Sequence, residues 1–148
     1  MRYFDIYLIK EEVARLYLGK EDLLYRLFME AKAEKNQQRL DILQKQIQYI
    51  TAAIPIAELK TKLHKLPVVD SADDKIELNQ EDSGIVKLKL NLTFIEIKVS
   101  GDNQAETVVF EALRRCFPHF FAVDYQNHYG AWLSPQKRHI LHHRQLVL

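Results

Sequence analysis

The sequence is poor in the residues that cross-link small proteins or form tight loops around ligands. It has one cysteine, four glycines and four prolines in 148 residues. A single cysteine excludes an internal disulfide and any metal site built from several thiolates. The sequence also has no glycine-rich phosphate loop, no serine or cysteine nucleophile motif and no HExxH arrangement. We therefore expect a protein that is not an enzyme and that uses no cofactor or metal.

Long apolar runs and an excess of charge of one sign are also lacking. No stretch approaches the roughly eighteen apolar residues of a membrane span, and the N-terminus has none of the features of a signal peptide. We expect a cytoplasmic protein without membrane contact. The 21 basic and 20 acidic residues give a formal net charge of +1, so binding of nucleic acid would need a local basic patch.

The composition and hydrophobic patterning predict a single α/β domain. Hydrophobic residues make up 47% of the chain, and 148 residues are enough for one substantial core. We expect a mixed sheet of about five strands with four to five helices packed on it. Expected strands are 2–9, 75–79, 85–100 with a turn or bulge near 91–93, 120–124 and 129–133; expected helices are 11–18, one starting at residue 20, 34–51, 57–66 and 103–116. Residues 68–74 are expected to be a connecting loop.

Two of the expected helices have an apolar pattern that goes beyond a single core-facing stripe. In residues 9–18, Val13, Leu16 and Tyr17 share one face, while Ala14 and Leu18 lie on another. In residues 34–51, a core stripe is flanked by a second strip of Ile42, Gln46 and Tyr49. The second face of residues 9–18 is either ordinary core or a surface that meets a partner, and periodicity does not decide between them. The repeat in residues 34–51 allows a coiled-coil seam, but two heptads are too few for one, so it favours intramolecular packing.

Other clusters suggest alternatives. Lys87, Lys89 and Lys98 form a basic strip on expected strands and, with the basic residues of 136–148, allow direct binding of DNA. Lysines on a solvated sheet face also protect edges and improve solubility. His139, His142 and His143, with His128 or His119, have spacings that allow a metal site of a hydrolase, although such a tail is more often simply solvated. Cys116 lies near a helix end, where the dipole raises a thiol pKa, so we interpret it as structural.

Several short blocks, taken together and in order, resemble the SirA family, the sporulation inhibitors of replication of Bacillus-type spore formers. The blocks are LIKEE at 8–12, YxG at 17–19, KQIQYIT at 45–51 with PI at 55–56, SGDxxAET at 100–107 and YGxWLxP at 129–135. The resemblance spans about residues 3–137. Residues 60–84 have no convincing match to the family, and the residues after 137 extend beyond the part that resembles it.

The resemblance implies a function that the patterning alone does not. Proteins of this family bind the N-terminal domain of the replication initiator DnaA and stop new rounds of replication. The family contact surface corresponds here to Val13, Leu16, Tyr17, Gln46 and Tyr49. Val13 is smaller than the aromatic residue expected at its position. The resemblance thus predicts a DnaA-binding domain over residues 1–135, monomeric when free and without direct contact to nucleic acid, followed by a basic tail over residues 136–148.

Overall fold

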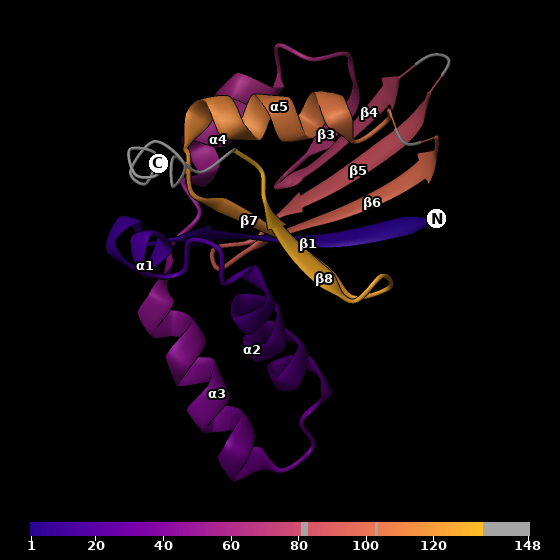
Figure 1. Cartoon of the computed structure of the whole chain (residues 1–148). Helices are drawn as coiled ribbons and strands as arrows, with labels where there is room; N and C mark the ends of the chain where they lie inside the picture. Colours follow the sequence, from indigo (N-terminus) through magenta and orange to yellow (C-terminus); the bar gives the residue numbers. More distant parts are fainter. Residues whose placement is uncertain (81–82, 103, 135–148) are drawn as a thin grey trace, which may run out of the picture.

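A single sheet of antiparallel strands organises the protein (Figure 1). The computed structural model describes residues 1–80, 83–102 and 104–134, and within them the sheet has eight strands. The strands are β1 (Arg2–Ile9), β2 (Thr51–Ala52), β3 (Val68–Ala72), β4 (Lys75–Gln80), β5 (Gly84–Leu90), β6 (Ile95–Gly101), β7 (Phe120–Asp124) and β8 (Tyr129–Trp132). Their order is β3-β4-β5-β6-β1-β7-β8, and β2 also pairs with β1.

The prediction of a mixed sheet of about five strands is wrong in both respects. Residues 68–74 are not a loop, because β3 pairs with β4 through a tight turn in which Asp73 has a φ of 54°. A two-residue strand, β2, follows helix α3 directly and was also missed. The sheet has no parallel pair among the described strands, since β1 lies between β6 and β7 and is antiparallel to both. The connection through helix α5 (Thr107–Cys116) therefore joins β6 to β7, two strands that run in the same direction but are separated by β1.

The five described helices agree with the predicted four to five. They are α1 (Glu11–Leu16), α2 (Glu21–Ala33), α3 (Gln37–Ile50), α4 (Ile56–Leu63) and α5 (Thr107–Cys116). The predicted break near 91–93 is confirmed, because β5 ends at Leu90 and β6 begins at Ile95. Among the described residues, every helix is too short or too polar to cross a bilayer.

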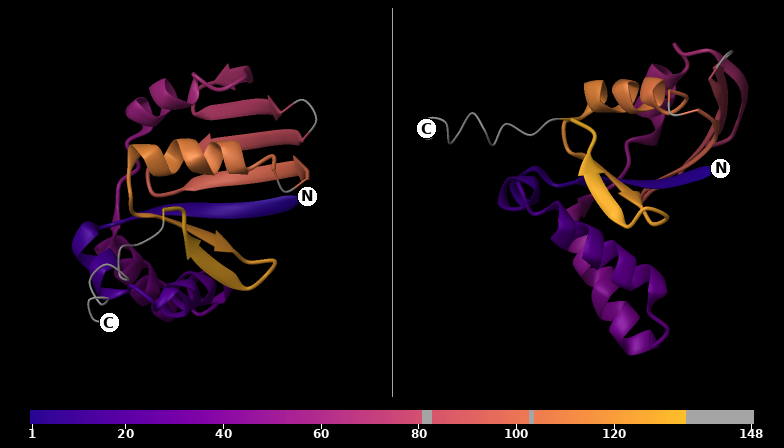
Figure 2. Two further views of the ribbon diagram at one scale, coloured as in Figure 1. Left: turned by 45° about the horizontal axis from the view of Figure 1, so that its top comes forward. Right: turned by 45° about the vertical axis from the view of Figure 1, so that its right-hand side comes forward.

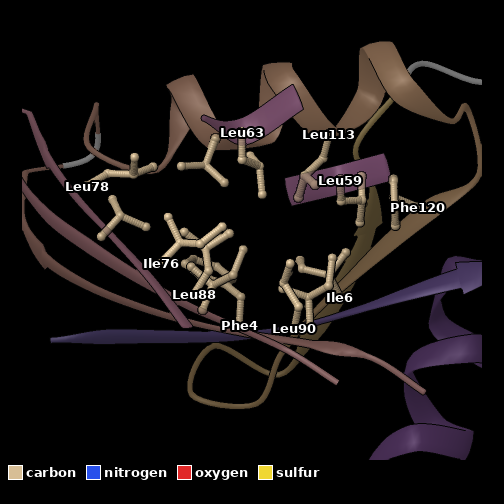
Figure 3. Close-up of a cluster of buried hydrophobic side chains, with 14 of the residues drawn as sticks. Phe4, Ile6, Leu59, Leu63, Ile76, Leu78, Leu88, Leu90, Leu113 and Phe120 are labelled. Atoms are coloured by element: carbon tan, nitrogen blue, oxygen red, sulfur yellow. The ribbon is translucent and has the colours of Figure 1, made fainter. Parts of the chain in front are cut away.

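The helices lie on opposite sides of the sheet and form two cores. Helices α4 and α5 cover one face, where alternate residues of β1, β4, β5 and β6 meet them (Figure 3). Helices α2 and α3 run side by side and extend away from the sheet on the other side, with α1 next to them (Figures 1 and 2). We call the buried cluster between the sheet and α4–α5 the large core, and the buried cluster between the sheet and α1, α2 and α3 the small core.

The central strands supply side chains to both cores. On β1, Phe4 and Ile6 face the large core, whereas Ile9 belongs to the small core. On β7, Phe120 faces the large core and Phe121 faces the small core. Strands buried on both faces explain why the sequence of β7, FFAVD, is almost continuously apolar. Strands β4, β5 and β6 contribute only to the large core, so their other face is open.

Candidate functional site

The five predicted contact residues line one groove, which lies between α1 and α3. The groove has a volume of about 640 Å³. Val13, Leu16 and Tyr17 come from the α1 segment, and Gln46 and Tyr49 come from α3. The remaining lining residues are Leu27, Ile42, Lys45 and Ile50. We refer to this feature as the α1–α3 groove.

A backbone hydrogen bond to α3 positions the start of α1, and a cap and a glycine define its end. At the start, the amide of Lys10 donates to the carbonyl of Ile50 at 2.9 Å, which ties the end of β1 to the end of α3. At the other end, Tyr17 is the C-cap of the helix, and Gly19 follows with a φ of 77°, a conformation that glycine adopts without strain. Ala14 is fully buried against the sheet side, so the opposite face of α1 is turned toward the groove.

Helix α3 presents the other wall of the groove. Its N-cap, Asn36, accepts a hydrogen bond from the amide of Arg39 at 3.1 Å, which satisfies one free donor of the first turn. Leu43 is buried against α2, whereas Ile42, Gln46 and Tyr49 lie along the adjoining strip at spacings of four and three residues. The strip predicted from the sequence is thus a surface that solvent reaches.

Exposure separates the floor of the groove from its rim. Leu16 is 70% exposed, Tyr49 is 75% exposed and Ile42 is 58% exposed, which is unusual for side chains of this size. Val13 is only 7% exposed and is part of the small core. The contact area available to a partner is therefore supplied mainly by Leu16, Ile42 and Tyr49, with Tyr17 half-buried between floor and rim.

Charged groups lie at the edge of the α1–α3 groove more than within it. Among the described residues that line it, Lys45 alone has a formal charge at neutral pH. The ammonium of Lys10 lies 5.3 Å from the centroid of the Tyr49 ring and holds that ring by a cation–π contact. Arg15 pairs with Glu11 at 2.9 Å on the exposed side of α1. The described lining has no carboxylate, histidine or thiol; its titratable side chains are those of Tyr17, Lys45 and Tyr49.

Sequence reasoning placed Ile42 on the correct strip but did not include it among the contact residues, and it missed Leu27, Lys45 and Ile50 entirely. The spacing of Ile42, Gln46 and Tyr49 was the available signal for the first of these. Leu27 comes from α2, and its position in the groove depends on how α2 packs against α3, which periodicity does not give.

The competing candidate sites have little to support them. Cys116 is half-buried, its thiol donates to the carbonyl of Ala112 at 3.2 Å, and burial raises its pKa, as for a structural thiol. In the part of the chain that the structure describes, no three ligating side chains are grouped for a metal. His139, His142 and His143 lie outside the described residues, as does the predicted tail.

The lysine strip lies on the open face of the sheet but is interleaved with acids. Lys87 lies 3.9 Å from Glu77, and Lys89 lies 4.0 Å from Glu96. Lys87 and Lys98 are direct cross-strand neighbours. Two acids, Glu77 and Glu96, thus interrupt the lysines of this face and reduce the positive potential available to a phosphate backbone.

Comparison with known proteins identifies the family. Residues 2–137 match the family described as "Sporulation inhibitor of replication protein SirA". The chain belongs to the SirA family. One relative, the sporulation inhibitor of replication protein SirA of Bacillus subtilis (strain 168), is 36% identical over 152 aligned positions, which cover 92% of this chain and 95% of the relative. The region matched to the SirA family includes every residue of the α1–α3 groove.

Proposed function

We propose that this SirA-family chain inhibits the initiation of chromosome replication during sporulation by binding the N-terminal domain of DnaA in the α1–α3 groove. The name of the Bacillus subtilis relative supports the inhibitory role. The observation that carries the proposed site is the gathering of Leu16 and Tyr49, both at least 70% exposed, in one groove from segments about thirty residues apart in the sequence.

The chemistry of the groove suits a small and reversible protein interface. Aromatic side chains that combine an apolar ring with a polar hydroxyl are frequent anchors, and Tyr17 and Tyr49 lie on either side of the groove. Gln46 supplies an amide that both donates and accepts hydrogen bonds between them. The partner surface that fits this arrangement is an apolar ridge with polar groups at its edges.

Inhibition in this proposal is by occupancy. A DnaA N-terminal domain whose surface is covered by the groove is no longer free to self-associate or to recruit partners at the origin. Inhibition by occupancy needs no chemical step. The inhibitor therefore acts in stoichiometric amounts.

The direct test is Tyr17→Ala with calorimetric measurement of binding to the DnaA N-terminal domain. Truncation of a central aromatic anchor should weaken binding by about 2 kcal/mol, which is close to thirtyfold in the dissociation constant. Tyr129→Ala is the matched control, because Tyr129 is 53% exposed on β8 and does not line the groove. If the folded Tyr17→Ala protein binds as tightly as the parent, the proposed site is wrong.

A further inference from the structure

A second pocket lies at the junction between the sheet and the α2–α3 pair. Its volume is about 440 Å³, and we call it the corner pocket. Asp5 and Tyr7 of β1 line it from the sheet, Lys32 from α2, and Gln44 and Gln48 from α3. On α3, these two glutamines are outside the set that lines the α1–α3 groove, so the two hollows use different residues of the same helix.

Aromatic rings form much of the wall of the corner pocket. The ring of Tyr7 stacks between Phe28 and Phe94, with centroids 4.1 and 5.4 Å away. Burial raises the pKa of both Tyr7 and Tyr125, so both hydroxyls remain neutral. Both faces of the Tyr7 ring are therefore covered, and the ring that contacts a cation is that of Tyr125, with the ammonium of Lys32 over it.

A carboxylate lies in this aromatic surrounding. The Asp5 side chain is 17% exposed, and its direct cross-strand neighbour on β6 is a second acid, Glu96. Like charges opposite each other on adjacent strands are unfavourable. Lys89 lies 4.0 Å from Glu96 and compensates that charge, which leaves Lys32 as the cation nearest to Asp5.

The protein's own ammonium group already marks the corner pocket as a cation site. The Nζ of Lys32 is 3.8 Å from Asp5 Oδ2 and 4.4 Å from the centroid of the Tyr125 ring. The Lys32 side chain is 61% exposed, so it reaches this position from solvent along a flexible stem and is free to leave it. When it leaves, the Asp5 carboxylate has no other cation as a close partner among the described residues.

We propose that the corner pocket receives the guanidinium group of an arginine side chain on a protein partner, with Lys32 displaced into solvent. A guanidinium is planar and stacks on aromatic rings, and its fork of N–H donors binds a carboxylate at two points, which an ammonium does not do. Asp5 supplies the carboxylate, and the side-chain carbonyls of Gln44 and Gln48 supply further acceptors. Competition with Lys32 makes the site selective, because a cation that binds Asp5 no better than the Lys32 ammonium does not displace it.

The test uses the full chain and a capped arginine, N-acetyl-arginine amide, titrated into isotope-labelled protein and followed by NMR. The backbone amides of the residues lining the corner pocket should shift on saturation. Lys32→Met removes the competing ammonium and should tighten binding by about threefold, whereas Asp5→Asn removes the charged acceptor and should weaken it by about tenfold. Lys98→Met is the charge-matched control, because Lys98 lies on the same sheet but outside the pocket, and it should leave the affinity unchanged.

The opposite signs of the two variants make the outcome decisive. If Lys32→Met weakens binding and Asp5→Asn strengthens it, the pocket selects anions and the proposal is wrong. Absence of saturable shifts in the parent and in Lys32→Met also overturns it. Capped lysine should bind more weakly than capped arginine, because it lacks the planar fork.

A second titration asks whether the arginine belongs to a protein. A short uncharged peptide with one central arginine should bind at least as tightly as the capped residue; much weaker binding would show that only a free small molecule enters, and would contradict the proposed partner. This inference is independent of the groove. Tyr17→Ala should leave arginine binding intact, so a failure of either proposal is recognisable on its own.

Discussion

The two cores of this protein differ in how completely their helices are buried. In the large core, α4 and α5 turn Leu59 and Leu113 fully inward, and the exposed faces of these helices are largely polar and charged. In the small core, α1 buries Ala14 but leaves Leu16 strongly exposed. The apolar side chains of the large core are thus covered within the protein itself, whereas the helices of the small core leave apolar surface that a partner is able to cover.

In the proposed function, stability and binding depend on different sides of one sheet. Strands β1 and β7 are shared by both cores, so the small core is anchored to a rigid base. Its helices extend away from that base and meet solvent on several sides (Figure 2). Changes in the large core should therefore affect folding, and changes at the surface of the small core should affect binding.

The largest expected effects come from truncating one buried side chain in each core. Phe28 of the small core is 1% exposed and stacks on Tyr7, and Leu59 of the large core is fully buried. Phe28→Ala and Leu59→Ala should each lower the free energy of unfolding by about 2–5 kcal/mol, measured by urea denaturation. At a temperature where both variants are folded, only Phe28→Ala should weaken binding of the DnaA domain, because α2 supports the groove.

The outcome that would break this comparison is equal weakening of binding by both substitutions, since the groove would then depend on the large core as well. Leu59→Met serves as the conservative control. It keeps most of the side-chain volume and should cost less than about 1.5 kcal/mol.

The sequence predicts the features that depend on residues close together in the chain, and it misses those that depend on long-range pairing. The break between β5 and β6 and the amphipathic strip of Ile42 and Tyr49 depend on local patterning, and both were predicted. Strand β3 was missed because its sequence, VVDSA, is short and polar at its end, and it forms by pairing with β4 at the sheet edge. The antiparallel order was also missed, because the insertion of β1 between β6 and β7 is a long-range choice.

The candidate site shows the same limit. Tyr17 and Gln46 were brought together by family resemblance, and the contact role of both stays a prediction. The depth of Val13 was not predictable from its helical face, because two faces of α1 are apolar and only the packing on α3 and the sheet decides which is covered. Val13 lies at the floor of the groove, so its small size alters the shape of the groove more than it alters the apolar area that the groove exposes.

A moderate effect, confined to binding, is expected for Leu16→Ala. Leu16 is 70% exposed in the free protein, so its truncation should change the free energy of unfolding by no more than about 0.5 kcal/mol. Binding of the DnaA domain should weaken by about 1 kcal/mol, as for a rim contact beside an aromatic anchor. Calorimetry and urea denaturation of the same preparation give both values. Leu92→Ala is the matched control, since Leu92 is 64% exposed and lies outside the groove; equal binding losses would argue against the groove.

A smaller, pH-dependent effect is expected at the corner pocket, where the small core meets the open sheet. Burial raises the pKa of Asp5 above its ordinary value of 3.8, Lys32 lowers it in part, and Glu96 raises it further. A carboxyl whose folded pKa is raised destabilises the native state above that pKa and has no such effect below the unfolded value. Asp5→Asn should therefore raise the melting temperature at pH 7, and the gain should vanish as the pH falls below about 4. A loss of stability at pH 7 would show that the pair with Lys32 outweighs burial.

The smallest effect is expected on the open face of the sheet, where the alternative of direct DNA binding is tested. The double charge reversal Lys87→Glu and Lys98→Glu should leave binding of the DnaA domain unchanged, because neither residue lines the groove. Neither the parent nor the variant should retard bare origin duplex at low salt, since Glu77 and Glu96 interrupt the positive charge of this face. Retardation of the parent that falls steeply with added salt, and that the double variant abolishes, would transfer the functional surface from the small core to the sheet.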